Sequence, residues 1–151
     1  MAEKKKILVV EDFDDARQLM ALCIRRLGYE VFEAVDGIEA LQLAAAVHPD
    51  LILMDLSMPR MDGLEATAHL KQDPATRDIP VIVLTAYAAP AQHDKALEAG
   101  ALEVLLKPIN LMALGEIFNR YFRQEEKTTV PLENYTEDKN AYKFEIFDLT
   151  T

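Results

Sequence analysis

The sequence predicts a doubly wound α/β fold, in which one five-stranded parallel sheet is covered on both faces by five helices. Short apolar runs alternate with longer stretches that place apolar residues at helical spacing, and this alternation repeats five times in about 122 residues. Most of the short runs are continuously apolar, as strands are when helices cover both faces of a sheet. Connections of helix length require parallel neighbouring strands and right-handed crossovers.

The five predicted strands are short apolar runs, and four of them are either rich in valine or isoleucine, which favour extended backbone, or too short for a helix. They comprise residues 7–10, 29–34, 51–54, 81–84 and 101–106. In a sheet of this type, ligands bind beyond the carboxyl ends of the strands, near the point where the strand order reverses. The residues that follow each run are therefore the candidates for a functional site.

Five helices are predicted between and after the strands, and glycine, proline or asparagine marks one end of most of them. They lie before Gly28, over residues 37–47 and 63–72, between Pro90 and Gly100, and after Asn110. Apolar spacing predicts which face of each helix enters the core. The predicted face residues are Leu19, Cys23, Ile24 and Leu27 in the first helix, Ile38, Leu41 and Ala45 in the second, and Leu97 as the one large anchor of the fourth.

Residues 1–122 are predicted to form one domain, because a chain of 151 residues has an ordinary single-domain size. Residues 123–151 differ in composition, with many charged residues and no helical apolar stripe. We interpret them as a polar and aromatic C-terminal tail without a separate effector domain. This tail either frays as a polar terminus or docks on a protein surface, and its aromatic residues favour docking slightly.

Composition and charge exclude several classes of protein. A net charge of −10 argues against a nucleic-acid groove, which needs clustered lysine and arginine. The longest unbroken apolar run has six residues, Leu19 to Ile24, whereas a membrane-spanning helix needs about 20. The N-terminus is too polar for a signal peptide, and the single cysteine has no partner for an internal disulfide. We therefore expect a soluble cytoplasmic protein without membrane insertion.

Polar side chains stand at the predicted carboxyl ends of four strands. Glu11 and Asp12 follow the first strand, Asp55 the third, and Thr85 and Lys107 the fourth and fifth. Three neighbouring carboxylates repel one another unless a positive group neutralises them, and a hard cation with oxygen ligands such as Mg²⁺ suits this set. A carboxylate at the mouth of such a site can attack phosphorus, while a hydroxyl and an ammonium share the charge of the transferred phosphoryl group.

Four longer motifs stand at these strand ends. They are Val9-Val10-Glu11-Asp12, Leu53-Met54-Asp55-Leu56-Ser57-Met58-Pro59-Arg60-Met61-Asp62-Gly63, Val83-Leu84-Thr85-Ala86 and Leu106-Lys107-Pro108. These motifs resemble those of the receiver domain of two-component response regulators, which has a flavodoxin-like fold. The resemblance covers about residues 5–122, and the four motifs occur in the order that the family has.

The resemblance implies a role for each of these polar residues. The implied roles are phosphoacceptor for Asp55, metal ligands for Glu11, Asp12, Asp55 and the backbone carbonyl of Ser57, switch hydroxyl for Thr85, and phosphate partner for Lys107. It also implies Mg²⁺ as the cofactor and a cis peptide bond between Lys107 and Pro108.

Two residues depart from the usual family pattern. Glu11 stands where aspartate is commoner, which lengthens the side chain but keeps its charge and its oxygen donors, so we expect metal binding to persist. Val104 stands three residues before Lys107, where many receivers have a tyrosine or phenylalanine. The aromatic side chain that usually moves on phosphorylation is therefore missing, which leaves open how this protein reports its state.

These features predict a single-domain response regulator of two-component or phosphorelay signal transduction. It would take a phosphoryl group from a histidine kinase or a histidine phosphotransfer protein onto Asp55 and signal to a downstream protein through contacts. It would promote its own phosphorylation and slow dephosphorylation without being a turnover enzyme. A turnover phosphatase would want a second catalytic carboxylate where Ser57 stands. We expect a monomer or weak dimer with no nucleic-acid partner.

The alternative is a receiver-like adaptor that acts independently of phosphorylation, through its surface and its C-terminal tail. Val104 favours this alternative slightly, whereas the intact set of Asp55, Thr85 and Lys107 favours phosphorylation more. The sequence leaves open whether a phosphorylated protein would be a relay intermediate or an end-point switch.

Overall fold

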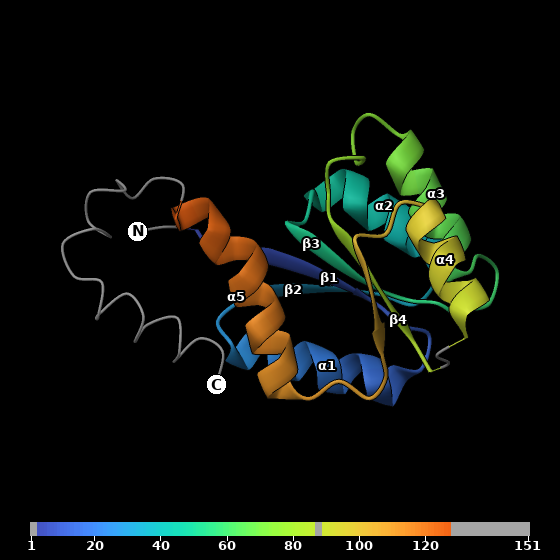
Figure 1. The fold of residues 1–151 in the computed structure, drawn as a ribbon. Helices are drawn as coiled ribbons and strands as arrows, with labels where there is room; N and C mark the ends of the chain where they lie inside the picture. Colours follow the sequence, from blue (N-terminus) through green and yellow to red (C-terminus); the bar gives the residue numbers. More distant parts are fainter. Residues whose placement is uncertain (1–2, 87–88, 128–151) are drawn as a thin grey trace. The chain divides into compact units, whose positions relative to one another are not determined.

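The computed structural model describes residues 3–86 and 89–127 of the chain, and these residues form five strands and five helices (Figure 1). The strands are β1 (Lys6–Val10), β2 (Glu30–Ala34), β3 (Leu51–Asp55), β4 (Val81–Thr85) and β5 (Glu103–Leu106). The helices are α1 (Asp14–Arg26), α2 (Gly37–Val47), α3 (Gly63–Gln72), α4 (Pro90–Glu98) and α5 (Leu111–Lys127). Among the described residues, no helix is long and apolar enough to span a bilayer.

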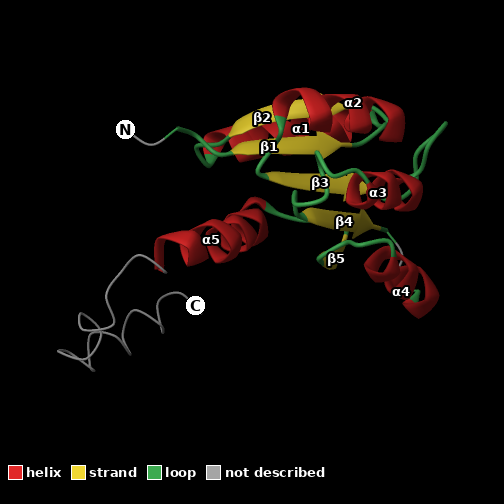
Figure 2. Ribbon diagram, turned by 90° about the horizontal axis from the view of Figure 1, so that it is seen from above, coloured by secondary structure: helices red, strands yellow, loops and turns green. Residues whose placement is uncertain are grey.

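The strands form one parallel sheet in the order β2-β1-β3-β4-β5, which confirms the predicted doubly wound fold (Figure 2). The chain passes from β1 to its neighbour β2 on one side, and from β3 onward it adds strands on the other side of β1. The strand order therefore reverses between β1 and β3, where a ligand site is expected in this fold. Because all strands run the same way, their carboxyl ends lie along one edge.

The core lies on both faces of the sheet, as the continuously apolar strands predicted. Figure 1 shows α1 on one face and α2 and α3 on the other. On the second face, alternate strand residues pack with small residues of the helices. This cluster includes Leu8, Val10, Ile52, Met54, Ala40, Ala44, Ala66 and Leu70. The intervening residues Ile7, Val9, Leu51 and Leu53 are equally buried.

The predicted helix faces are partly wrong. In α1 the residues buried are Arg17, Ala21 and Ile24, whereas Leu19 is 63% exposed. The remaining faces follow the same pattern: α2 buries Gly37, Ala40 and Ala44 while Ile38 and Ala45 are exposed, and α4 buries Ala96 while Leu97 is exposed. Apolar spacing gives weight to large side chains, but where these helices lie close to the sheet they bury mainly small ones.

The described residues from Met112 to Lys127 belong to a second unit of the chain, which is described by itself. On α5 the rings of Phe118 and Phe122 stack with a centroid distance of 6.1 Å. The described part of this helix extends to Lys127, so residues 123–127, the first residues that we assigned to the tail, are helical. Residues 128–151 lie outside the described part, and the division of the chain at residue 122 stays a prediction.

Asp36 is a buried carboxylate that begins α2. Its Oδ1 accepts a hydrogen bond from the Glu39 N–H at 2.9 Å, and its Oδ2 accepts one from the Arg60 Nε at 2.7 Å. The pKa of Asp36 is held below its ordinary value, first by the backbone hydrogen bond from Glu39 and then by Arg60, and burial opposes this shift. The ionised form of Asp36 therefore stabilises the folded chain.

This shift predicts a pH-dependent loss of stability in Asp36→Asn. Asparagine keeps an acceptor for the helix N-terminus but removes the charge, so we expect the free energy of unfolding to fall by about 1 kcal/mol at pH 7. A carboxyl with a lowered folded-state pKa stabilises above its unfolded pKa and loses that contribution as the pH falls through the folded value. The difference from wild type should therefore shrink below about pH 4.

Urea unfolding followed by circular dichroism at pH 7 and pH 3 measures this difference. Asp62→Asn is the matched control, because Asp62 also begins a helix but is exposed. A difference for Asp36→Asn that stays constant between the two pH values would contradict the expected role of the charge.

Candidate functional site

Three carboxylates meet at the edge of the sheet where the strand order reverses. Glu11 directly follows β1, and Asp55 is the last residue of β3; both are buried, whereas the neighbouring Asp12 is exposed. Each of the three offers an oxygen, and these oxygens lie within 4.8 Å of one another. The predicted acidic residues are thus brought together, and their donor set consists of carboxylate oxygens, which hard divalent cations prefer.

The position of Asp55 is fixed by the close approach of α3 to the end of β3. A Cβ placed on Gly63 would lie 2.1 Å from the Asp55 carbonyl oxygen, so only glycine fits here without movement of the backbone. The Gly63 N–H also donates to the Leu56 carbonyl at 3.0 Å. Helix α3 therefore begins against the backbone of the residue whose carboxylate enters the site.

Lys107 joins two of the three carboxylates. Its Nζ lies 2.6 Å from Oε1 of Glu11 and 2.7 Å from Oδ1 of Asp55. Burial disfavours the ammonium, but the hydrogen bonds to Asp55 and Glu11 outweigh burial, and the pKa of Lys107 is raised. The lysine is therefore charged at neutral pH and neutralises part of the acidic cluster.

Asp12 shows that this neutralisation is incomplete. Loss of hydration raises the pKa of Asp12, and so do a hydrogen bond with Glu11 and repulsion by its charge. Lys107 opposes the shift only in part. The cluster keeps an excess of negative charge that a further cation would relieve.

The other predicted site residues are joined to this cluster through the backbone. Thr85 is the buried last residue of β4 and stands in register with Leu106 of β5, and its carbonyl accepts a hydrogen bond from the Lys107 N–H at 2.8 Å. Ser57 is exposed in the loop that follows Asp55. The peptide bond between Lys107 and Pro108 is cis, as the resemblance implied.

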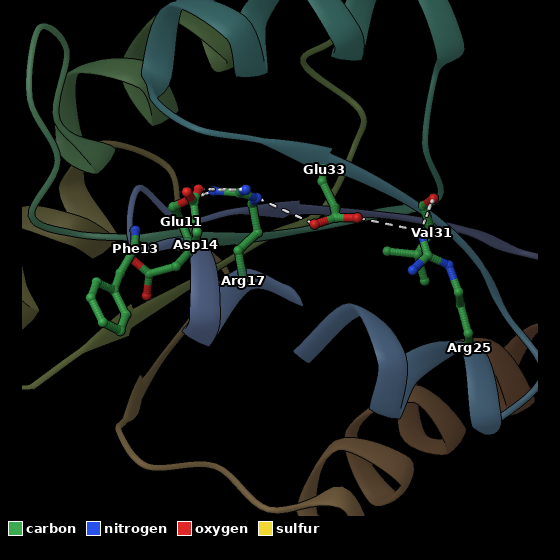
Figure 3. A network of polar contacts seen from close by, with 7 residues as sticks. All are labelled: Glu11, Phe13, Asp14, Arg17, Arg25, Val31 and Glu33. Atoms are coloured by element: carbon green, nitrogen blue, oxygen red, sulfur yellow. Dashed lines mark hydrogen bonds and ion pairs between the residues drawn. The ribbon is translucent and has the colours of Figure 1, made fainter. Parts of the chain in front are cut away.

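Sequence analysis missed Arg17, a buried arginine of α1 that holds the acidic segment in place (Figure 3). Its Nη1 donates to the Glu11 carbonyl at 3.1 Å, and its Nε donates to Glu33 on β2 at 3.2 Å. Its Nη2 lies 2.7 Å from Oδ1 of Asp14. The spacing of Asp14 and Arg17 within one helix is a weak signal that could have pointed to this arginine.

Two contacts orient the side chain of Glu11. Its Oε2 accepts a hydrogen bond from the Phe13 N–H at 3.3 Å (Figure 3). Its Oε1 contacts Lys107. The network extends along β2, because Arg25 also pairs with Glu33 at 3.4 Å. Backbone and side chain of Glu11 are therefore both held before any ligand binds.

A cavity of about 290 Å³ lies next to Thr85, between α4 and β5. Its lining residues are Thr85, Pro90, His93, Asp94, Val104, Leu105 and Leu106. Val104, at the position where many receivers have an aromatic residue, is one of them and leaves part of this space unfilled.

Comparisons with known proteins agree on one family. Residues 7–119 match the response regulator receiver domain. The polar-differentiation response regulators DivK of Brucella ovis and Brucella anthropi are each 38% identical over 117 residues, which cover 78% of this chain and 95% of DivK.

Solved structures show the same fold. The chemotaxis protein CheY4 of Vibrio cholerae is 31% identical with a TM-score of 0.74, over 78% of this chain and 98% of that one. The receiver domain of the sensor histidine kinase PA1611 from Pseudomonas aeruginosa is 34% identical with a TM-score of 0.73, over 79% and 98%. That structure contains a magnesium ion coordinated in its active site cleft.

The contacts of Lys107 predict that Lys107→Met destabilises the metal-free protein. The buried carboxylates of Glu11 and Asp55 would lose their shared ammonium, and we expect the free energy of unfolding at pH 7 to fall by about 2 kcal/mol. Chemical unfolding in the presence of a chelator measures this change. Lys95→Met, at an exposed position of α4, is the control, and an equal effect of both substitutions would contradict the prediction.

Proposed function

Because the chain belongs to the response regulator receiver family, we propose that it accepts a phosphoryl group on Asp55 in two-component or phosphorelay signalling. The donor is the phosphohistidine of a histidine kinase or a histidine phosphotransfer protein. The signal then passes to a downstream protein through contacts on the surface of the domain. The observation that carries this proposal is the meeting of Glu11, Asp12, Asp55 and Lys107 at the edge where ligands bind in this fold.

The acidic cluster suits Mg²⁺ as a cofactor, since its donors are carboxylate oxygens and its excess charge is negative. Glu11, Asp12, Asp55 and the backbone carbonyl of Ser57 would hold the ion. When bound, Mg²⁺ supplies positive charge that stabilises the phosphoryl oxygens during transfer.

The residues of the chain then perform distinct steps. A carboxylate oxygen of Asp55 forms a bond to phosphorus while the bond from phosphorus to the histidine nitrogen of the donor breaks, which leaves the imidazole with the electron pair. The Lys107 ammonium binds a phosphoryl oxygen, and the Thr85 hydroxyl donates a hydrogen bond to another. Slow attack by water on phosphorus later breaks the bond between phosphorus and the Asp55 oxygen, which releases inorganic phosphate and restores the carboxylate. The protein therefore switches between two states and is not a turnover enzyme.

Thr85 offers a route from the site to the surface. It stands at the end of β4 and also lines the cavity between α4 and β5. A movement of Thr85 toward the phosphoryl group would change the shape of this cavity. Helix α4 borders the cavity and is weakly anchored, because Ala96 is the one residue that it buries. Weakly anchored elements shift most readily when a neighbouring contact changes.

The second candidate function is a receiver-like adaptor that works without phosphorylation. Val104 is the observation that favours it, because an aromatic residue that could report the phosphorylated state is absent at that position. This adaptor would keep the fold and the protein contacts but would take up no phosphoryl group.

Intact-mass analysis after incubation with Mg²⁺ and a small acyl phosphate separates the two candidates. We expect one added phosphoryl group on the wild-type chain and none on Asp55→Asn or without Mg²⁺. Asp78→Asn, an exposed position in the loop before β4, is the matched control and should react like wild type. A folded wild-type chain that takes up no phosphoryl group and binds no beryllofluoride would support the adaptor.

A further inference from the structure

The loop from residue 56 to 62 starts directly after Asp55 and contains an unusual turn. The Met61 N–H donates to the Pro59 carbonyl at 2.7 Å, which closes a three-residue turn around Arg60. The φ of Arg60 is 64°. A three-residue turn with a positive central φ is the rare and strained form of the γ-turn, and arginine gains nothing from this backbone region, which suits glycine. Other contacts must therefore hold Arg60 in this conformation.

An ion pair supplies such a contact. The Nε of Arg60 donates to Oδ2 of Asp36 at 2.7 Å, and its Nη2 contacts the same oxygen. The side chain of Asp36 is only 3% exposed, whereas that of Arg60 is 60% exposed. A buried carboxylate depends on a charged donor, and hydrogen bonds between charged groups are stronger than neutral ones. The pair thus offsets the strain at Arg60.

The backbones of the same two segments also meet. The Gly37 N–H donates to the Met61 carbonyl at 3.1 Å. A Cβ on Gly37 would lie 2.7 Å from that carbonyl oxygen, so the close approach requires glycine at this position. The end of the loop is fixed as well, because Gly63 packs against the backbone of Asp55. Residues 56–62 are therefore held at two places. Met61 contacts Gly37 at the start of α2, and Gly63, the first residue of α3, packs against Asp55.

We propose that the ion pair between Arg60 and Asp36 is a positioning device for the phosphorylation site, which makes Arg60 a positioning residue for Mg²⁺ binding. This inference rests on the proposed function, in which Ser57 of the same loop offers its backbone carbonyl to the ion. A loop that is already ordered loses less conformational entropy when a ligand binds, so its affinity is higher. Strained residues that surrounding contacts hold in place are concentrated at ligand sites.

Four variants separate the ion pair from the strain and from the helix cap. Arg60→Ala removes the guanidinium but keeps a Cβ at the strained position, whereas Arg60→Gly removes both. Asp36→Ser removes the ion pair but keeps an oxygen that can cap α2. Arg77→Ala is the control. Arg77 is exposed in the loop before β4, at the amino-terminal ends of the strands, whereas the site lies at their carboxyl ends.

Hydrogen exchange of the metal-free protein is the first measurement. We expect the Gly37 and Met61 amides to lose protection in Arg60→Ala and Asp36→Ser, because both amides donate within the contacts that the ion pair holds. The Glu39 amide, which donates to Asp36, should keep its protection in Arg60→Ala. Arg77→Ala should match wild type at all three amides.

Calorimetric titration with Mg²⁺ is the second measurement. We expect Arg60→Ala and Asp36→Ser to raise the half-saturating Mg²⁺ concentration roughly fivefold, a smaller change than the loss of a group that touches a metal ligand directly. Arg60→Gly should lie between Arg60→Ala and wild type, because relief of the strain offsets part of the loss. The double variant of Arg60→Ala and Asp36→Ser should bind Mg²⁺ like either single variant, since one interaction is removed in each case.

The outcomes distinguish this inference from the proposed function. Wild-type Mg²⁺ affinity in Arg60→Ala and Asp36→Ser would overturn the positioning role, whether or not the two amides lose protection. A wild-type chain that binds no Mg²⁺ and takes up no phosphoryl group would overturn the proposed function, and the positioning role with it. Weaker Mg²⁺ binding in both variants, with phosphoryl uptake restored by excess Mg²⁺, is the result that supports the role of the ion pair.

Discussion

The crowding of three carboxylates at one edge of a parallel sheet is the constraint on which the rest of this structure depends. Glu11 and Asp55 stand at the ends of neighbouring strands, and parallel pairing gives them no way to separate. Lys107, which follows the outer strand β5, contacts both carboxylates. Its charge neutralises one of the three carboxylates and leaves the cluster negative. In the free protein this geometry brings the carboxylates close enough to repel one another, but it also provides a donor set for a divalent cation.

Each carboxylate-bearing segment is held by a contact outside the cluster. Arg17 binds the backbone of Glu11, Gly63 lets α3 begin against the backbone of Asp55, and the pair of Arg60 and Asp36 fixes the loop that follows. A site that is already ordered loses little entropy when a ligand arrives. The surrounding arginines and glycines therefore help to set the geometry at the carboxyl ends of the strands.

The sequence predicted the sheet and the polar strand ends because both are local patterns: an apolar run and the residue that follows it. Parallel topology then brings those ends together, which explains why Asp55 and Lys107 could be placed together without a structure. Arg17 escaped prediction because its partner Glu33 lies 16 residues away and joins it only through folding. The predicted helix faces were partly wrong for a different reason, since Leu19 and Leu97 are exposed while small residues such as Ala96 are buried.

Those small helix faces have a consequence for where the molecule can change. The edge of the sheet is held by ion pairs and by close backbone contacts, whereas α4 buries one alanine and borders a cavity of about 290 Å³. Thr85 belongs to both regions, because it ends β4 beside Lys107 and lines that cavity. Local stability follows the number of buried contacts, so we expect a movement of Thr85 to displace α4 more readily than the acidic cluster. We therefore expect the packing of α4, which borders the cavity beside Val104, to register such a change.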